Sequence, residues 1–150
     1  MAPAHEVPFN LSRFVGAQAK DYSRALAELR AGKKQTHWIW YVFPQLRGLG
    51  SSSMANFYAI GSVQEAEAYL AHSVLGPRLR ESVTAMNALD ALSAAQVLGQ
   101  IDAAKFRSCL TLFGSVDPND AIFGEALDKY FAAAPDEKSI ALLDVLRRDA

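Results

Sequence analysis

The segment from residue 32 to residue 53 gathers side chains that could bind a small anion. Four of the fifteen aromatic residues, including both tryptophans, lie between Trp38 and Phe43. Hydrogen-bond donors flank this aromatic run on both sides: Lys33, Lys34, His37, Gln45 and Arg47. Small-ligand pockets are built in this way, from an apolar wall beside a few convergent polar groups. The segment therefore predicts a binding site for a small anionic ligand.

His37 and Trp38 are the candidates for a catalytic group and a pocket wall. An imidazole can donate or accept a proton near neutral pH, so we predict that His37 is the polar or acid–base group of the site. The alternative is that its ring forms a hydrogen bond at the start of a helix. Aromatic rings offer a large apolar face at low conformational cost, so Trp38, Trp40 or Tyr41 could stack on a ligand, and Trp38 is the one we place in the site. The alternative is that these rings belong to the core.

The Gly/Ser loop after the aromatic run is the second part of the predicted site. It contains Gly50, Ser51 and Ser52 and leads into an apolar patch that we expect to be helical. Free N–H groups and a partial positive charge at a helix N-terminus attract anions such as phosphate. Arg47 could add a bidentate contact. The alternative is an ordinary loop in which Ser53 caps the helix.

Lys105 and Ser108 are predicted to bring a second helix to the same ligand. Residues three apart on a helix face the same way, so the ammonium and the hydroxyl could hold one anionic group together. A solvated helix face is the alternative. Gln18 lies between Val15 and Tyr22 on an otherwise apolar helix stripe. Because a buried amide must find partners, Gln18 either braces a loop backbone or contacts the ligand.

The chain contains no motif of an established metal or catalytic site. The HExxH, paired CxxC, Walker and GxSxG sequences are all missing, and Gly48-Leu-Gly50 is only half of a dinucleotide-binding motif. We therefore expect no metal ion and no cofactor. Cys109 is expected to be buried and inert, because apolar residues surround it at helical spacing. Four glutamates on the predicted helices are expected to be solvated: Glu28, Glu65, Glu67 and Glu81.

Helices are expected to position all of these side chains. Apolar residues recur at helical spacing, between small polar residues and Gly or Pro, along most of the chain. We predict a mainly α fold, a single compact domain of about eight helices over residues 1–150, with residues 1–8 extended or flexible. Helix starts are expected at Asn10, Ser62, Ser73, Ser93, Asp102, Asp117 and Asp136, and helix ends at Gly32, Gly99 and Gly114. The run 38–43, between a Thr36 cap and a Pro44 stop, fits a short helix or a short strand, because periodicity cannot decide so short a run.

Composition limits the class of protein. The chain has 150 residues, of which 51% are hydrophobic and 21% charged, as in one globular domain. A formal charge of −1 argues against a general nucleic-acid binder, which needs net positive charge. A single cysteine, no visible signal peptide and no long apolar run lead us to expect a cytoplasmic protein without a membrane segment. We expect a monomer, or a homodimer that uses the apolar patch around Phe57 and Tyr58.

Several motifs of the chain occur together in one known family. They are Phe14 with Ala17-Gln18 and Tyr22, Gly32-Lys33, His37-Trp38, Tyr41 to Ser51, Tyr58 to Ile60, Glu65-Ala66, Tyr69 to His72, Leu75 to Leu79, and Lys105 to Ser108 with Thr111 to Phe113. They resemble the bacterial and fungal family named domain of unknown function 1810, which is sometimes automatically tagged as calpastatin-like. The resemblance covers nearly the whole chain and implies one mostly helical domain with no settled activity. The calpastatin tag does not fit, because that inhibitor is a disordered repeat protein.

A more distant similarity concerns the ligand. Small helical domains that act on N-glycosidic links of ADP-ribose-like compounds also combine an aromatic-rich helix start with a later basic helix that carries hydroxyls. In that group a glutamate precedes the histidine of the aromatic motif, whereas Thr36 precedes His37 here. The similarity therefore implies phosphate or nucleotide binding but puts glycosidase chemistry in doubt.

The sequence as a whole predicts a pocket protein or an enzyme for a small anionic ligand of nucleotide, ADP-ribose or sugar-phosphate type. The alternative is a protein-interaction module or a homodimer without catalytic activity.

Overall fold

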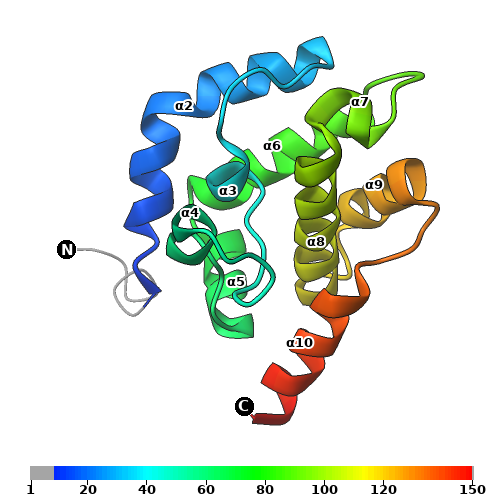
Figure 1. Ribbon diagram of the computed structural model, residues 1–150. Helices are drawn as coiled ribbons and strands as arrows, with labels where there is room; N and C mark the ends of the chain where they lie inside the picture. The colour runs from blue at the N-terminus through cyan, green and yellow to red at the C-terminus, as the bar shows by residue number, and fades with distance from the viewer. Residues whose placement is uncertain (1–8, 150) are drawn as a thin grey trace.

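Helices form nearly all of the regular structure in residues 9–149, the range that this computed structural model describes (Figure 1). The nine helices of that range are α2 (Ser12–Ala31), α3 (Ile39–Val42), α4 (Ser53–Phe57), α5 (Val63–Ala71), α6 (Leu75–Asn87), α7 (Ala94–Leu98), α8 (Gln100–Val116), α9 (Ala121–Phe131) and α10 (Glu137–Asp149). The predicted mainly α fold is confirmed. The expectation for residues 1–8 lies outside the described residues. None of the described helices is long and apolar enough to cross a membrane.

Local sequence signals set several helix ends where they were expected. α2 ends at Gly32, whose backbone is left-handed (φ 78°), a conformation that glycine adopts without steric cost. α7 begins with a capping box in which Ser93 and Gln96 each accept the other's backbone N–H. α10 follows Asp136, whose carboxylate accepts the N–H of Ser139 at 2.9 Å. These three boundaries follow from residue type alone.

The two ends of α8 differ from the prediction. The helix begins at Gln100, two residues before the expected Asp102 cap, and continues through Gly114 to Val116. Gly114 lies within the helix, where the absence of a side chain leaves room for the neighbouring helix. A Cβ atom at this position would lie 3.3 Å from the Cβ of Phe123 on α9. The glycine thus lets two helices approach each other closely.

Two further helix starts also differ from the prediction. Ser73 does not cap α6. Instead Nδ1 of His72 accepts two backbone N–H groups of the first turn, at 3.0 and 3.2 Å. A helix start leaves such groups unpaired, so a histidine acceptor can replace a serine cap. α9 begins three residues later than expected, after Asp120 rather than Asp117.

The aromatic run forms the short helix α3 and not a strand. Thr36 does not cap it, because its hydroxyl donates to Glu28 instead. Of the six residues 38–43, five are buried and only Trp40 is partly exposed. One turn of helix points side chains in all directions, so a segment that is surrounded by protein can be apolar throughout.

α8 is the central helix of the fold and packs against α3, α5, α7, α9 and α10 (Figure 1). Its aromatic side chains contact aromatic rings of the neighbouring segments. Phe106 contacts Phe43 at a ring-centroid distance of 4.6 Å, and Phe113 contacts Tyr69 at 5.3 Å. On the other side of α3 lies α2, which also packs against α6. Residues 108–113 of α8 are all buried, whereas the first half of the helix leaves one face to solvent.

A short backbone bridge positions the loop between α3 and α4. Leu46 and Ile60 form an isolated parallel β-bridge, in which the N–H of Arg47 donates to the carbonyl of Ile60 at 2.9 Å. The N–H of Ile60 in turn donates to the carbonyl of Gln45 at 2.9 Å. In Figure 1 this loop runs alongside the exposed face of α8. It forms one wall of the groove described next.

Candidate anion-binding groove

Three adjoining hollows lie along the first half of α8, and Lys105 lines all three. The largest, about 710 Å³, is also lined by His37, Trp40 and Ile101. The second, about 360 Å³, is lined by Gln45, Gly50, Ser108 and Lys138, and again by Ile101. The third holds only about 10 Å³, between Trp40, Phe43, Gln45, Tyr58 and Lys105. We call these three hollows together the Lys105 groove.

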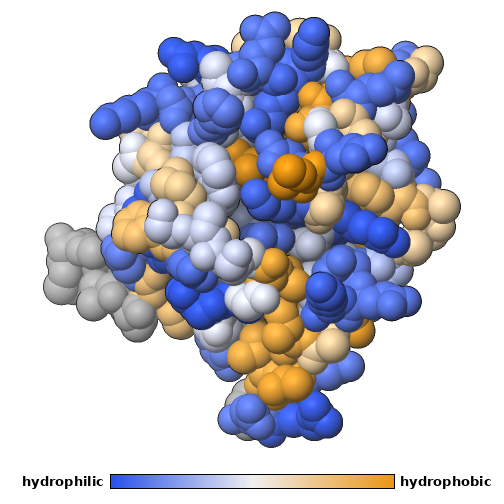
Figure 2. Space-filling view, in the orientation of Figure 1, coloured by the Kyte–Doolittle hydropathy of each residue, from blue (hydrophilic) through white to orange (hydrophobic). Residues whose placement is uncertain are grey.

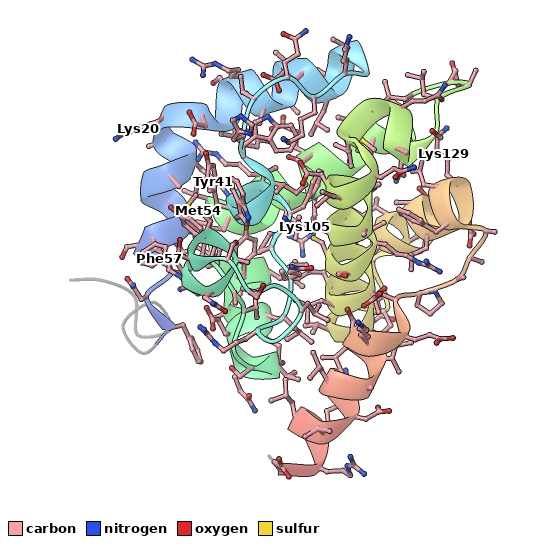
Figure 3. The ribbon with its side chains drawn as sticks, in the orientation of Figure 1. Lys20, Tyr41, Met54, Phe57, Lys105 and Lys129 are labelled. Carbon is pink, nitrogen blue, oxygen red and sulfur yellow. The ribbon has the colours of Figure 1, made fainter. Side chains whose placement is uncertain are left out.

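The figures place the groove at the centre of one face of the molecule. In Figure 3, Lys105 lies between α8 and the loop that follows α3. Figure 2 shows this region of the surface as a recess with hydrophilic and hydrophobic side chains around it. Ile101 lines two of the hollows and is 75% exposed, the largest exposure among the large apolar side chains of the described residues.

The charges in the largest hollow do not cancel. Lys34 forms a salt bridge with Asp102 at 2.9 Å, and both side chains are largely buried. Lys105 lies 3.9 Å from the other oxygen of the same carboxylate. The Lys105 ammonium also lies 5.4 Å from the ring centroid of Trp40, within the range of a cation–π contact. Two ammonium groups therefore share one carboxylate, which leaves one positive charge in excess beside an aromatic ring.

The second hollow adds one more lysine and one more carboxylate. Lys138 lines it and is exposed. Asp136 lines it too, but its carboxylate oxygen Oδ2 already accepts the N–H and the hydroxyl of Ser139 at 2.9 and 2.6 Å. Three lysines and two aspartates line the three hollows, so the groove carries a formal charge of +1, although the whole chain has a formal charge of −1.

Glu28 holds the segment that carries His37. Its carboxylate accepts four hydrogen bonds: from the backbone N–H groups of Gln35 and Thr36, from the Thr36 hydroxyl, and from the indole N–H of Trp38. Partial burial raises the pKa of Glu28, but these hydrogen bonds outweigh it and lower the pKa to about 2. The expectation that Glu28 is simply solvated was wrong. It fixes the end of α2 to the start of the groove wall.

Glu28→Gln is expected to destabilise the protein at neutral pH by about 2 kcal/mol, because an amide cannot accept all four hydrogen bonds. The Glu28 pKa is lowered on folding, so its contribution is complete above its ordinary value of 4.5 and is lost as the pH falls towards about 2. Urea denaturation of both proteins between pH 7 and pH 2 measures this. The difference is expected to shrink across that acidic range.

Glu67→Gln, at an exposed position on α5, is the matched control and should change little at any pH. A Glu28→Gln protein that is as stable as the wild type at pH 7 would contradict the role assigned to this carboxylate.

Five of the ten site residues predicted from the sequence line the Lys105 groove: His37, Gln45, Gly50, Lys105 and Ser108. The i, i+3 pairing predicted for Lys105 and Ser108 places both in the second hollow. The Ser108 hydroxyl, however, donates to the carbonyl of Ala104 at 3.1 Å. Because the hydroxyl hydrogen is already used in that bond, the Ser108 oxygen can act towards the groove as a hydrogen-bond acceptor. Gly50 is needed for a close approach, because a Cβ there would lie 2.6 Å from the Cβ of Ala55.

Gln18 and Trp38 lie in the core. The Gln18 amide nitrogen donates to the carbonyl of Tyr41 at 2.7 Å and to the Tyr69 hydroxyl at 3.2 Å, so it braces the backbone of α3. Trp38 is 1% exposed and bonds to Glu28 through its indole nitrogen at 2.9 Å. Neither side chain lines the described hollows of the groove. Gln18 braces backbone, although that of a helix and not of a loop, and Trp38 takes the core position that was its alternative.

The other three predicted site residues, Arg47, Ser51 and Ser52, lie in the loop before α4 and outside the groove. The Arg47 guanidinium donates to the carbonyl of Asn56 at 3.2 Å. The Ser51 carbonyl accepts from the Asn56 side chain at 3.3 Å. Ser52, and not Ser53, caps the helix by accepting the N–H of Ala55. These groups form hydrogen bonds between the loop and α4, and they do not line the hollows that contain His37 and Lys105.

Three groove residues were not among the predicted site residues: Ile101 and Lys138, which the sequence did not suggest, and Trp40, which it suggested only as one of three rings that could stack on a ligand. Trp40 stands two positions from Trp38, and only the direction of α3 decides which of the two rings faces outward. Ile101 could have been noticed as an apolar residue on the polar side of its helix. No signal in the sequence connects Lys138 with Lys105, because they meet through the packing of α10 against α8.

Other titratable groups have structural surroundings. Glu65, expected to be solvated, is buried and pairs with Arg13 at 2.7 Å. Cys109 is fully buried among apolar side chains, and burial raises the pKa of its thiol. Within residues 9–149 no group of three or more His, Cys, Asp and Glu side chains is arranged to hold a metal ion. The polar side chains that line the groove carry ammonium, imidazole, amide, indole and hydroxyl groups and the carboxylates of Asp102 and Asp136.

The fold and the groove define an all-helical domain with a ligand-sized, positively charged groove along its central helix. The chain belongs to the family described as "Protein of unknown function (DUF1810)", whose sequence model matches residues 8–143. It is similar to a crystal structure titled as the conserved hypothetical protein Rv1873 from Mycobacterium tuberculosis, with 46% identity and a TM-score of 0.90. The match covers 91% of this chain and 98% of that one. No curated protein matches the chain.

Proposed function

We propose that the protein binds a small anionic ligand of nucleotide, ADP-ribose or sugar-phosphate type in the Lys105 groove. The observation that carries this proposal is the unbalanced charge. Lys34 and Lys105 approach the single carboxylate of Asp102 at 2.9 and 3.9 Å, so one ammonium lacks a full counter-charge. An anion that enters the groove supplies it. Because a groove excludes part of the solvent, such an interaction is stronger than at an open surface.

The rest of the groove supports a ligand larger than a bare anion. Trp40 and Ile101 offer apolar surface on either side of Lys105, and Ile101 is 75% exposed. Gln45 adds an amide that can donate and accept hydrogen bonds. A phosphate attached to a ribose or a base would use both kinds of surface. The 710 Å³ of the largest hollow lies within the size range of small-ligand sites, about 300–1,000 Å³.

His37 is proposed as the group that transfers a proton or contacts the ligand at the rim. Its side chain is exposed and lines the largest hollow, and the Glu28 hydrogen bonds hold its segment in place. The proposal locates the protein in the cytoplasm, where its single thiol stays reduced. Incubating each bound compound with the wild type and with His37→Gln, and analysing the products, separates an enzyme from a binding protein.

Lys105→Met tests the proposal, because it removes the ammonium and keeps an unbranched apolar chain of similar length. We expect wild-type protein to bind ADP-ribose, ADP or ribose 5-phosphate in calorimetric titrations. We expect Lys105→Met to bind about 10- to 100-fold more weakly, since a hydrogen bond to a charged group contributes roughly 1.5–3 kcal/mol. Adenosine, which is neutral, should show no comparable loss, and added salt should weaken only the anionic ligands.

Lys20→Met is the matched control. Lys20 is exposed on α2, far from Lys105 in Figure 3, so this variant makes the same change of charge outside the groove. It should bind like the wild type. The proposal fails if none of these anions binds with saturation, or if Lys105→Met and Lys20→Met bind equally well.

A homodimer is the alternative candidate, and one observation favours it. Phe57 is 55% exposed and Met54 is 38% exposed, both on α4, and Figure 3 places them at the edge of the molecule. Large apolar side chains that cluster at the surface are common at interfaces. Light scattering of the wild type and of Phe57→Ser tests the homodimer. Self-association through α4 predicts that the wild type is a dimer and that the variant is a monomer.

A further inference from the structure

The indole N–H of Trp40 is a buried donor without a hydrogen-bond partner among the described residues. Three other buried side-chain atoms share this condition: Gln18 Oε1, Ser82 Oγ and Asn87 Oδ1. Trp40 differs from them because its side chain lines the Lys105 groove, in both the largest and the smallest hollow. Leaving such a group unpaired is costly, so native proteins nearly always supply an acceptor. Because Nε1 itself is buried, an acceptor in the groove reaches it only when the Trp40 ring turns or the smallest hollow widens.

The smallest hollow has room for about one oxygen atom. Its volume of about 10 Å³ is close to the minimum that holds a single water-sized group. Its lining includes Trp40, Gln45, Tyr58 and Lys105, and each of these side chains carries a hydrogen-bond donor. The Lys105 ammonium lies 5.4 Å from the centroid of the Trp40 ring, so the cation and the indole belong to the same part of the groove.

We propose that Trp40 Nε1–H donates a hydrogen bond to an anionic oxygen of the ligand, and that Lys105 pairs with the charge of the same group. This inference rests on the proposed function and specifies its ligand as an oxyanion, a phosphoryl or carboxylate group. A neutral hydroxyl could satisfy the indole but would leave the excess positive charge of Lys34 and Lys105 without a partner. A charged oxygen satisfies both, and charge-assisted hydrogen bonds are the stronger kind.

The two tryptophans make this inference directly measurable. Only Trp38 and Trp40 carry an indole N–H, so a proton–nitrogen correlation spectrum of the protein contains two indole signals. Trp40→Phe removes one of them and thereby assigns both. Titration with ADP-ribose or inorganic phosphate should move the Trp40 signal strongly. The Trp38 signal should move little, because its donor is already bonded to Glu28.

Affinity provides the second readout. Trp40→Phe keeps a flat apolar ring and removes the donor, so it should weaken ADP-ribose binding about tenfold. Without ligand the variant should be as stable as the wild type or more stable, because it no longer buries an unpaired N–H. A merely structural role, such as a bond to a permanent buried water, predicts the opposite, a less stable variant with unchanged affinity.

Different results would overturn this inference and the proposed function on which it rests. If the ligand binds and Lys105→Met weakens it, while the Trp40 indole signal does not move, the inference is overturned and the proposed function stands. If no oxyanion binds at all, both are overturned. A moving indole signal together with a tenfold loss in Trp40→Phe supports both.

Discussion

Arg13→Lys is expected to lower the free energy of unfolding by about 3 kcal/mol or more. The guanidinium of Arg13 is buried and donates all five of its N–H groups. The acceptors are the carbonyls of Phe9, Asn10, Phe57 and Ala59, at 2.6 to 2.9 Å, and the carboxylate of Glu65, at 2.7 Å. It also lies 4.3 Å from the ring centroid of Phe14. A lysine has three donors on one atom and cannot reach acceptors arranged around a planar fork.

The loss should be visible in urea denaturation and as a fall of about 10 °C in the melting temperature, since 1 kcal/mol corresponds to roughly 2–4 °C at this chain length. Arg30→Lys is the matched control. Arg30 is largely exposed and 3.7 Å from Glu81, so the same change there should cost less than about 0.5 kcal/mol. Equal stabilities of the two variants would show that the arrangement around Arg13 is not selective for a guanidinium.

Gly76→Ala is expected to destabilise the protein by about 3 kcal/mol, which exceeds the usual effect of adding one methyl group. Gly76 lies in the first turn of α6, where a Cβ atom would lie 2.1 Å from the carbonyl oxygen of Leu70. That oxygen belongs to the backbone of α5 and cannot move without shifting the helix. The same Cβ would lie 3.0 Å from the side chain of Arg80. Relief therefore requires α5 and α6 to separate.

Gly124→Ala provides a control with the opposite sign. Gly124 is exposed within α9, and a Cβ atom there would meet nothing within 4 Å. Alanine should stabilise that helix by about 0.5–1 kcal/mol, because it restricts the unfolded chain and favours helical backbone. If Gly76→Ala were also neutral or stabilising in thermal and urea unfolding, α5 and α6 could not pack as closely as described.

Much of the fold could be predicted because helical patterns and caps are local. The end of α2 at Gly32 and the start of α7 at Ser93 depend on residues a few positions apart. The predictions of helix ends failed where a contact with a residue far away in the sequence decides the local structure. Gly114 reads as a helix end, but it is a contact surface for Phe123. Nothing in the sequence near residue 76 indicates the Leu70 carbonyl that makes its glycine necessary.

The candidate site could be predicted only in part, for the same reason. His37 and Lys105 were suggested by their chemistry, and they line one hollow because α3 and α8 pack together. Trp38 and Trp40 are chemically identical, and only tertiary packing turns one towards Glu28 and the other towards the groove. Arg47 has suitable chemistry but is turned towards Asn56. Residue type identified the donors, whereas the approach of distant helices decided which of them meet.

The bridge between Leu46 and Ile60 has a consequence for how this groove can change. Both of its hydrogen bonds use main-chain atoms only, from Gln45, Arg47 and Ile60. The side chain of Gln45 can therefore be exchanged without releasing the loop from its anchor. Descendants of this chain could alter which ligand the groove selects, one rim residue at a time, while inheriting the same loop path. The main-chain bridge thus fixes the path of the loop, whereas the side chains that the loop presents at the rim are free to change.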